Sequence, residues 1–156
     1  MMVLFILLLF ANNTISDLSV REMYKASTKD EETCLELLEL LKEDDELNSS
    51  PTKLAFYGGT LTLMAFYSNN PIDKLIYSRK ANKALDRSVK LDPQSFDGRS
   101  LRILYNANVP IFLSDHDELK EDILLFNSLI RSPQDYSIYN QWMISIINET
   151  LSKSKL

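Results

Sequence analysis

From residue 17 onward, apolar residues recur at intervals of three and four, and clusters of Pro, Asn and Ser interrupt them. This spacing is typical of amphipathic α-helices, whereas strands need a sustained apolar/polar alternation that the chain lacks. The pattern predicts seven helices joined by short loops, at about 18–26, 30–43, 51–67, 71–92, 95–106, 115–130 and 134–152. The expected fold class is therefore all-α, with antiparallel helical hairpins in an array of about seven helices.

The pattern also predicts which faces of these helices turn inward. The helix at 30–43 carries one apolar stripe and an opposite face of glutamates, and the helix at 51–67 is apolar on most sides, which predicts a central position. Asp115 and Glu118 have the spacing of a capping box at the start of 115–130. In the first and last helices the residues expected to be buried are Leu18, Met23, Tyr24, Tyr136, Tyr139, Trp142 or Met143, and Ile146.

The N-terminus has the layout of a secretory signal peptide. The apolar run 3–11 is too short for a membrane-spanning helix of about 20 residues, and small polar residues follow it. Thr14 and Ser16 are spaced like the small residues before a cleavage site. This predicts a signal peptide at 1–16 and a single mature domain at 17–156, exported to the periplasm or secreted. No Lys or Arg precedes the run, so two alternatives stay open: an uncleaved segment that tethers a peripheral protein to a membrane, or a first helix packed in the core.

Composition narrows the chemistry. Twenty-two acidic and 17 basic residues give a net charge of −5, which argues against a general nucleic-acid binder. One Cys excludes an internal disulfide, and one His excludes most metal and triad chemistries. We therefore expect no catalytic residues, metal or cofactor. A remote alternative is an enzyme of unknown type, in which His116 or Asp117 would act.

Charge is unevenly distributed along the chain. Residues 30–46 contain nine acids and one base, whereas residues 74–102 contain eight bases and three acids. Helical spacing places Lys80, Lys83, Arg87 and Lys90 on one face of the helix at 71–92, which makes them a candidate binding ridge. The alternative is an ordinary solvated face. No aromatic residue interleaves these cations as nucleic-acid stacking would require.

Two consecutive helices resemble the helical hairpin of a tetratricopeptide repeat. Within 71–93, the small, large, small and Pro positions of the repeat's second helix match Ala81, Leu85, Ser88 and Pro93. In 51–67, the first-helix positions match Leu54, Tyr57, Gly58 and Leu61, with Gly58 as the site of close contact between the helices. The resemblance covers about 52–106. The unit is about eleven residues longer than the standard 34, and Arg99, Arg102 and Ile103 replace the small and aromatic residues of a second repeat.

More broadly, four stretches of sequence are similar to a group of small uncharacterised exported bacterial proteins. They are the segments 53–58, 70–75, 91–93 and 108–113. The repeat resemblance implies a groove at Tyr57, Gly58, Leu61 and Tyr77, although these residues could equally be core. The expected role is a non-catalytic protein-binding or scaffold module whose partner is another protein or peptide. The sequence leaves the oligomeric state open.

Overall fold

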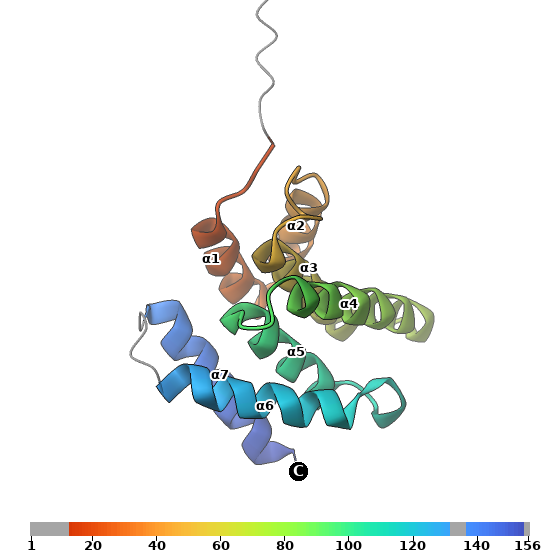
Figure 1. Ribbon diagram of the computed structural model, residues 1–156. Helices are drawn as coiled ribbons and strands as arrows, with labels where there is room; N and C mark the ends of the chain where they lie inside the picture. Colours follow the sequence, from red (N-terminus) through yellow and green to blue (C-terminus); the bar gives the residue numbers. More distant parts are fainter. Residues whose placement is uncertain (1–12, 132–136, 155–156) are drawn as a thin grey trace, which may run out of the picture.

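The computed structural model describes residues 13–131 and 137–154, and these residues form seven α-helices, one short 3-10 helix and no strand (Figure 1). The expected all-α class is therefore confirmed. The elements are α1 (Asp17–Ser27), α2 (Glu31–Lys42), α3 (Pro51–Tyr67), α4 (Pro71–Leu91), α5 (Phe96–Asn108), η1 (Ile111–Leu113), α6 (His116–Arg131) and α7 (Ile138–Lys153).

Helix starts follow local chemistry closely. Each α-helix is preceded by a residue whose side-chain oxygen accepts a hydrogen bond from a backbone N–H of the first turn, which satisfies a donor that has no partner within the helix. Pro51 and Pro71 then occupy the first helical positions of α3 and α4, where a missing N–H costs nothing. The seven capping residues are Ser16, Asp30, Ser50, Asn70, Ser95, Asp115 and Ser137.

Two helices organise the core. α3 contacts α1, α2, α4 and α5, and α5 contacts α6 and α7 in addition to α3 and α4. This central place agrees with the apolar character of α3 on most sides. In Figure 1 the α3–α4 hairpin extends to one side of the molecule, and α6 and α7 lie on the far side of α5 from α3.

The antiparallel pair α3–α4 depends on a glycine contact. A Cβ atom built on Gly58 would lie 2.6 Å from Cγ of Leu85 and 3.1 Å from the carbonyl oxygen of Ala81. At the far end of the pair, the Ser88 hydroxyl donates to the Pro51 carbonyl at 2.7 Å. Any larger side chain at position 58 would therefore push α4 away from α3.

The structure corrects several details of the expected packing. Leu18 is 69% exposed, and Val20 is buried in its place. In α7 the buried stripe is Tyr139, Met143 and Ile147, because this four-residue spacing faces the hydrophobic core, whereas Ile146 is half-buried. The expected start of this helix at Gln134 and the burial of Tyr136 lie outside the described residues.

The expected capping box at α6 forms only in part. The Asp115 carboxylate accepts hydrogen bonds from the backbone N–H groups of Asp117 and Glu118, as a capping residue should. The Glu118 side chain binds Arg102 instead of returning to the Asp115 N–H, which donates to Asn106. A nearby cation has therefore replaced the second half of the motif.

Candidate functional site

Three of the four ridge cations line a cleft beside α3, which we call the basic cleft. Side chains of α4 form one wall, and α3 together with the loop between α2 and α3 forms the other. The cleft encloses about 270 Å³. Its lining residues are Leu47, Asn48, Leu54, Tyr57, Lys80, Lys83, Ala84 and Arg87. Lys90, the fourth ridge residue, is exposed one turn further along α4 and does not line the cleft.

The three cations of the basic cleft differ in whether a neighbouring residue holds them. Arg87 is held by the α2–α3 loop, since its guanidinium donates to the Asn48 side-chain oxygen at 3.2 Å and to the Asn48 carbonyl at 2.9 Å. Lys80 and Lys83 are exposed, and the ion pairs of the described residues do not include them. One fixed and two unpaired cations therefore surround the cleft.

Apolar side chains form the floor of the cleft. Leu54 is 4% exposed and Ala84 is 7% exposed, and both belong to the α3–α4 contact. Tyr57 is half-buried at the edge, so an aromatic ring stands beside the cations. Sequence spacing along α4 could not reveal this ring, because it comes from a different helix.

The groove expected from the sequence does not form as a surface. Leu61 is 1% exposed and Gly58 is buried, because Leu85 of α4 packs directly over Gly58. Tyr77 is half-buried against the core and does not line the basic cleft. Of the four groove residues, only Tyr57 reaches the candidate site.

The positions matched to the repeat lie at the helix–helix contact. Leu54, Gly58, Ala81, Leu85 and Ser88 are buried, and the exposed Pro93 follows the end of α4. These residues therefore position the two walls of the basic cleft, and Leu54 also lines it.

A second ionic group is buried between α5 and α6, where the repeat pattern is lost. Asp122 is fully buried, and its two oxygens accept from Arg99 at 2.6 Å and from Arg102 at 2.7 and 2.9 Å. Glu118 and Asp86 lie 3.2 and 3.1 Å from the same Arg102 guanidinium. The group therefore joins α4, α5 and α6.

Burial and charge shift the pKa values in this group. Burial opposes the charged form of Arg102, but the hydrogen bonds and charge of Asp122 outweigh it and raise the pKa of Arg102. Burial raises the pKa of Glu118, and Asp86 adds to that effect while Arg102 opposes it. Arg102 therefore stays charged, because the buried carboxylate of Asp122 lies beside it.

The structure also places the other candidate residues of the sequence, which are His116, Asp117 and Cys34. His116 and Asp117 are exposed in the first turn of α6. Within the described ranges, no three His, Cys, Asp or Glu side chains are grouped so that they could hold a metal ion. Cys34 is buried with its Sγ 3.7 Å from the Thr60 carbonyl, and burial raises its pKa to about 12, so the thiol stays protonated at neutral pH.

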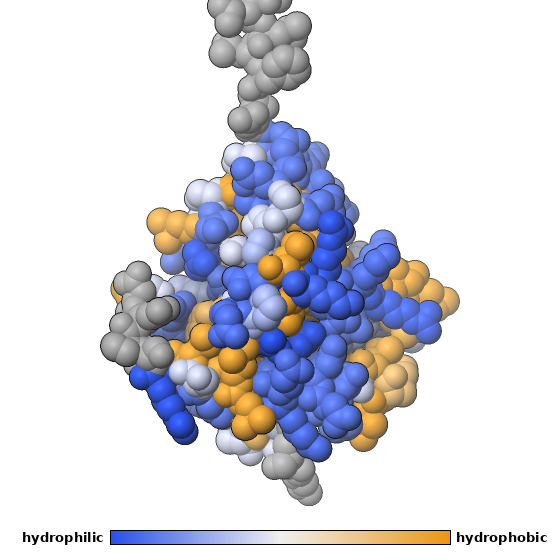
Figure 2. Space-filling model, in the orientation of Figure 1, coloured by the Kyte–Doolittle hydropathy of each residue, from blue (hydrophilic) through white to orange (hydrophobic). Residues whose placement is uncertain are grey.

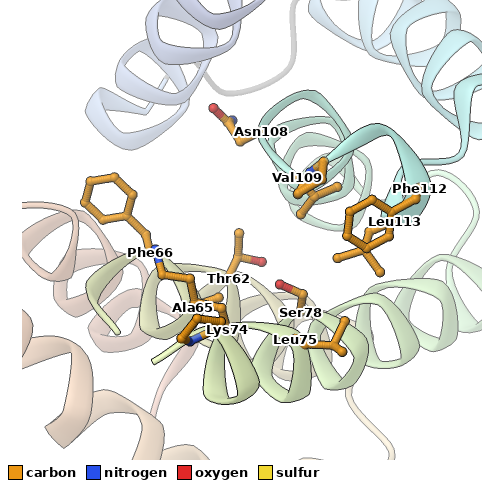
Figure 3. Close-up of a pocket in the computed structure, with 12 residues that line it drawn as sticks. Thr62, Ala65, Phe66, Lys74, Leu75, Ser78, Asn108, Val109, Phe112 and Leu113 are labelled. Atoms are coloured by element: carbon orange, nitrogen blue, oxygen red, sulfur yellow. The ribbon is translucent and has the colours of Figure 1, made fainter. Parts of the chain in front are cut away.

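Sequence reasoning missed an apolar hollow at the tip of the α3–α4 hairpin, which we call the apolar groove. Figure 3 shows it between the end of α3, the start of α4 and the segment 108–113. It encloses about 390 Å³. The available signal was the apolar run Pro110–Leu113 in a stretch expected to be a loop. The lining residues are Thr62, Ala65, Phe66, Pro71, Lys74, Leu75, Ser78, Asn108, Val109, Pro110, Phe112 and Leu113.

Comparison with known proteins assigns no family to this arrangement. No protein-family model matches the chain, and no curated protein or solved structure matches it significantly. Among the described residues, none of the helices combines the length and the apolar character needed to cross a bilayer.

Proposed function

We propose that the protein is an exported, non-catalytic binding module, and that the basic cleft binds an acidic segment of a partner protein. One observation carries the proposal: Lys80, Lys83 and Arg87 meet Tyr57 around a single apolar-floored cleft. A solvated helix face needs no such floor and no arginine fixed to a neighbouring loop. Complementary charge gives such an interface its specificity and speeds association.

The chemistry of the cleft defines the class of ligand. The cations suit carboxylates, and Arg87 presents a planar guanidinium already held in place by Asn48. The floor made by Leu54 and Ala84 suits an apolar side chain next to those carboxylates. The preferred ligand is therefore an extended or helical peptide segment in which Asp or Glu alternates with a bulky apolar residue.

The proposal includes a tetratricopeptide-like arrangement of α3 and α4. It is supported by the antiparallel pairing of the two helices and by the close contact at Gly58, which uses small residues where that family uses them. The pairing of α5 with α6 departs from the family, because ion pairs replace small apolar contacts there. Tetratricopeptide-like packing is thus proposed for one hairpin and not for a repeated array.

A charge-reversal series tests the binding proposal. The probe is a fluorescent peptide of alternating Glu and Leu, and the measurement is fluorescence anisotropy over a range of salt concentrations. Replacing Lys80, Lys83, Arg87 and Lys90 by Glu should weaken binding at least about tenfold and remove most of its salt dependence. Replacing Tyr57 by Ala should weaken binding without changing the salt dependence.

The matched control is Arg79→Glu. Arg79 is exposed on the same helix and has the same charge, but it does not line the basic cleft. A single Lys83→Glu change should weaken binding much more than Arg79→Glu. Equal effects of the two changes would mean that overall charge, and not the cleft, governs binding. Circular dichroism confirms that each variant keeps its helical content.

A further inference from the structure

The rim of the apolar groove exposes an unusual number of large apolar side chains. Phe66 and Phe112 are 76% and 80% exposed and stand on opposite sides of the hollow (Figure 3). Ile72 and Ile111 are 68% and 79% exposed, and each follows or precedes a residue that lines the groove, Pro71 and Phe112 respectively. In Figure 2 the start of α4 and the η1 segment carry two apolar clusters at one edge of the molecule.

The exposed area is large enough for a stable protein interface. A fully exposed large apolar side chain presents about 150–200 Å², with isoleucine at the lower end, so these four residues expose roughly 500 Å². Soluble monomers rarely expose apolar patches beyond a few hundred Å² without an interaction function. Covering this patch on two partners would bury about 1,000 Å² in total, which is the smallest area expected of a specific interface.

The charge of the surface limits the kind of partner. Lys74 is the only charged residue among those that line the groove, and it is exposed, so its ammonium can stay in water. None of the described residues that line the groove has a carboxylate that could pair with a cation of a different protein. An interface core free of charge matches an equally uncharged apolar surface.

The shape of the surface is complementary to itself. The patch contains both a hollow of about 390 Å³ and protruding rings on its rim. In a two-fold arrangement each copy contributes the same patch, so a residue that projects from one copy enters the hollow of the other. Phe112, on the η1 side of the hollow, is placed to enter in this way.

We infer that the apolar groove is the interface through which two copies of this chain form a homodimer. Phe112 and Ile111 of each copy fill the groove of the other, between the α3–α4 tip and η1. The basic cleft lies on the α2–α3 loop side of the same hairpin and shares no lining residue with the groove, so dimer formation leaves it open. The dimer is thus independent of the proposed peptide binding and would present two clefts.

Sedimentation equilibrium over a wide concentration range tests the inference. The wild-type protein should approach twice the 18.0 kDa of one chain. Phe112→Glu and Ile111→Glu should each raise the dimer dissociation constant by more than about a hundredfold, because each places a charge in an apolar interface. The control is Leu124→Glu, which alters a residue 73% exposed on α6, away from the groove. All variants keep the same N-terminal segment, so any self-association through that segment is the same in every sample.

Thiol cross-linking gives a second readout that does not depend on affinity. Cys34 is buried and protonated, so a cysteine introduced at position 111 is the reactive thiol. A short bifunctional reagent should link Ile111→Cys chains in pairs and leave Leu124→Cys chains single. A wild-type protein that stays monomeric overturns the inference, as does a dimer that the Glu variants leave intact. Monomers that instead bind phosphatidylcholine vesicles through Phe112 would show a lipid-facing surface and also overturn it.

Discussion

At the scale of single residues, Asp44 is a buried carboxylate outside the candidate site that holds several partners. It is almost fully buried and accepts hydrogen bonds from the backbone N–H of Ile15 and of Glu46, each at 2.8 Å. The ammonium of Lys53, itself 3% exposed, lies 3.0 Å away. One carboxylate therefore ties the N-terminal segment, the α2–α3 loop and the first turn of α3 together.

Changing this carboxylate should produce a pH-dependent loss of stability. Burial disfavours the charged form of Asp44, but the hydrogen bonds from Ile15, Lys53 and Glu46 outweigh it, so its pKa is lowered from 3.8. The stabilisation is therefore present above pH 3.8 and is lost as the pH falls through the lower pKa of the folded state. Asp44→Asn should cost about 2 kcal/mol at pH 7, since Lys53 keeps only its exposed partner Glu46.

Urea unfolding of the wild type and of Asp44→Asn at a series of pH values measures this effect. The difference in unfolding free energy between the wild type and Asp44→Asn should be constant near neutral pH and should become smaller below pH 3.8. Glu36→Gln removes an exposed charge of α2 and serves as the control. A gap that does not change with pH would show that the substitution acts through packing and not through charge.

At the scale of elements, the α3–α4 hairpin and the α5–α6 hairpin are held together by different kinds of contact. α3 and α4 approach through small residues, whereas α5 and α6 are joined by buried ion pairs around Asp122 and by the stacked rings of Phe96 and Phe126. The small-residue contact of α3 and α4 can be predicted from the sequence, because small residues recur there at a fixed spacing within one segment. The ion pairs of α5 and α6 cannot be predicted in this way, because Arg99 and Arg102 resemble surface residues until their partner on α6 is known.

Removing Asp122 alone from the ion-pair group between α5 and α6 should destabilise the fold. Replacing Asp122, Arg99 and Arg102 together by apolar residues should destabilise it much less. Asp122→Ala leaves two buried guanidinium groups without this carboxylate, which should cost about 3–5 kcal/mol of unfolding free energy. The triple change Arg99→Met, Arg102→Met and Asp122→Leu replaces charges by apolar side chains of similar length and should recover most of that loss.

Chemical denaturation of the wild type, the single variant and the triple variant provides the comparison. The readout is the unfolding free energy, with the denaturant dependence checked for a common unfolded state. If the triple variant proved as unstable as Asp122→Ala, the ion pairs themselves, and not the unpaired charges, would carry the stability of the hairpin.

At the scale of the whole molecule, the N-terminal segment is part of the folded body from Asn13 onward. The Asn13 N–H donates to Asp45, the Ile15 N–H donates to Asp44, and the Ser16 hydroxyl caps α1. Removal of residues 1–16, as the small-residue spacing suggests, would remove all three contacts. If this segment is cleaved, a cut at or before Asn13 would keep the three contacts, whereas the expected cut before Asp17 would remove them.

Intact mass and fractionation of the protein expressed with its native N-terminus in a bacterial host test both export and the position of the cut. The expected product is soluble in the periplasm and begins at or before Asn13. A product beginning at Asp17 would contradict the role given to residues 13–16 and would melt at a lower temperature than a chain that retains them. A full-length product held in the membrane would favour the tethered alternative.

The sequence by itself determined the seven α-helices of the described residues and, apart from the start of the last one, their ends to within two residues. Apolar periodicity places the helices, and local residues such as Ser50 with Pro51, or Asp92 with Pro93, fix where they begin and stop. These signals are readable because each one acts between residues a few positions apart in the chain. The same local logic made Gly58 visible as a point of close helix contact.

Only the tertiary structure decided which surfaces exist. It covered Gly58 and Leu61 with α4, brought Tyr57 beside the cations of α4, and opened a hollow between two segments at least thirty residues apart. Such outcomes depend on which helix faces which, and that is set by the sum of many packing contacts over the whole core. No short stretch of sequence contains that information, so the helices could be predicted and the grooves between them could not.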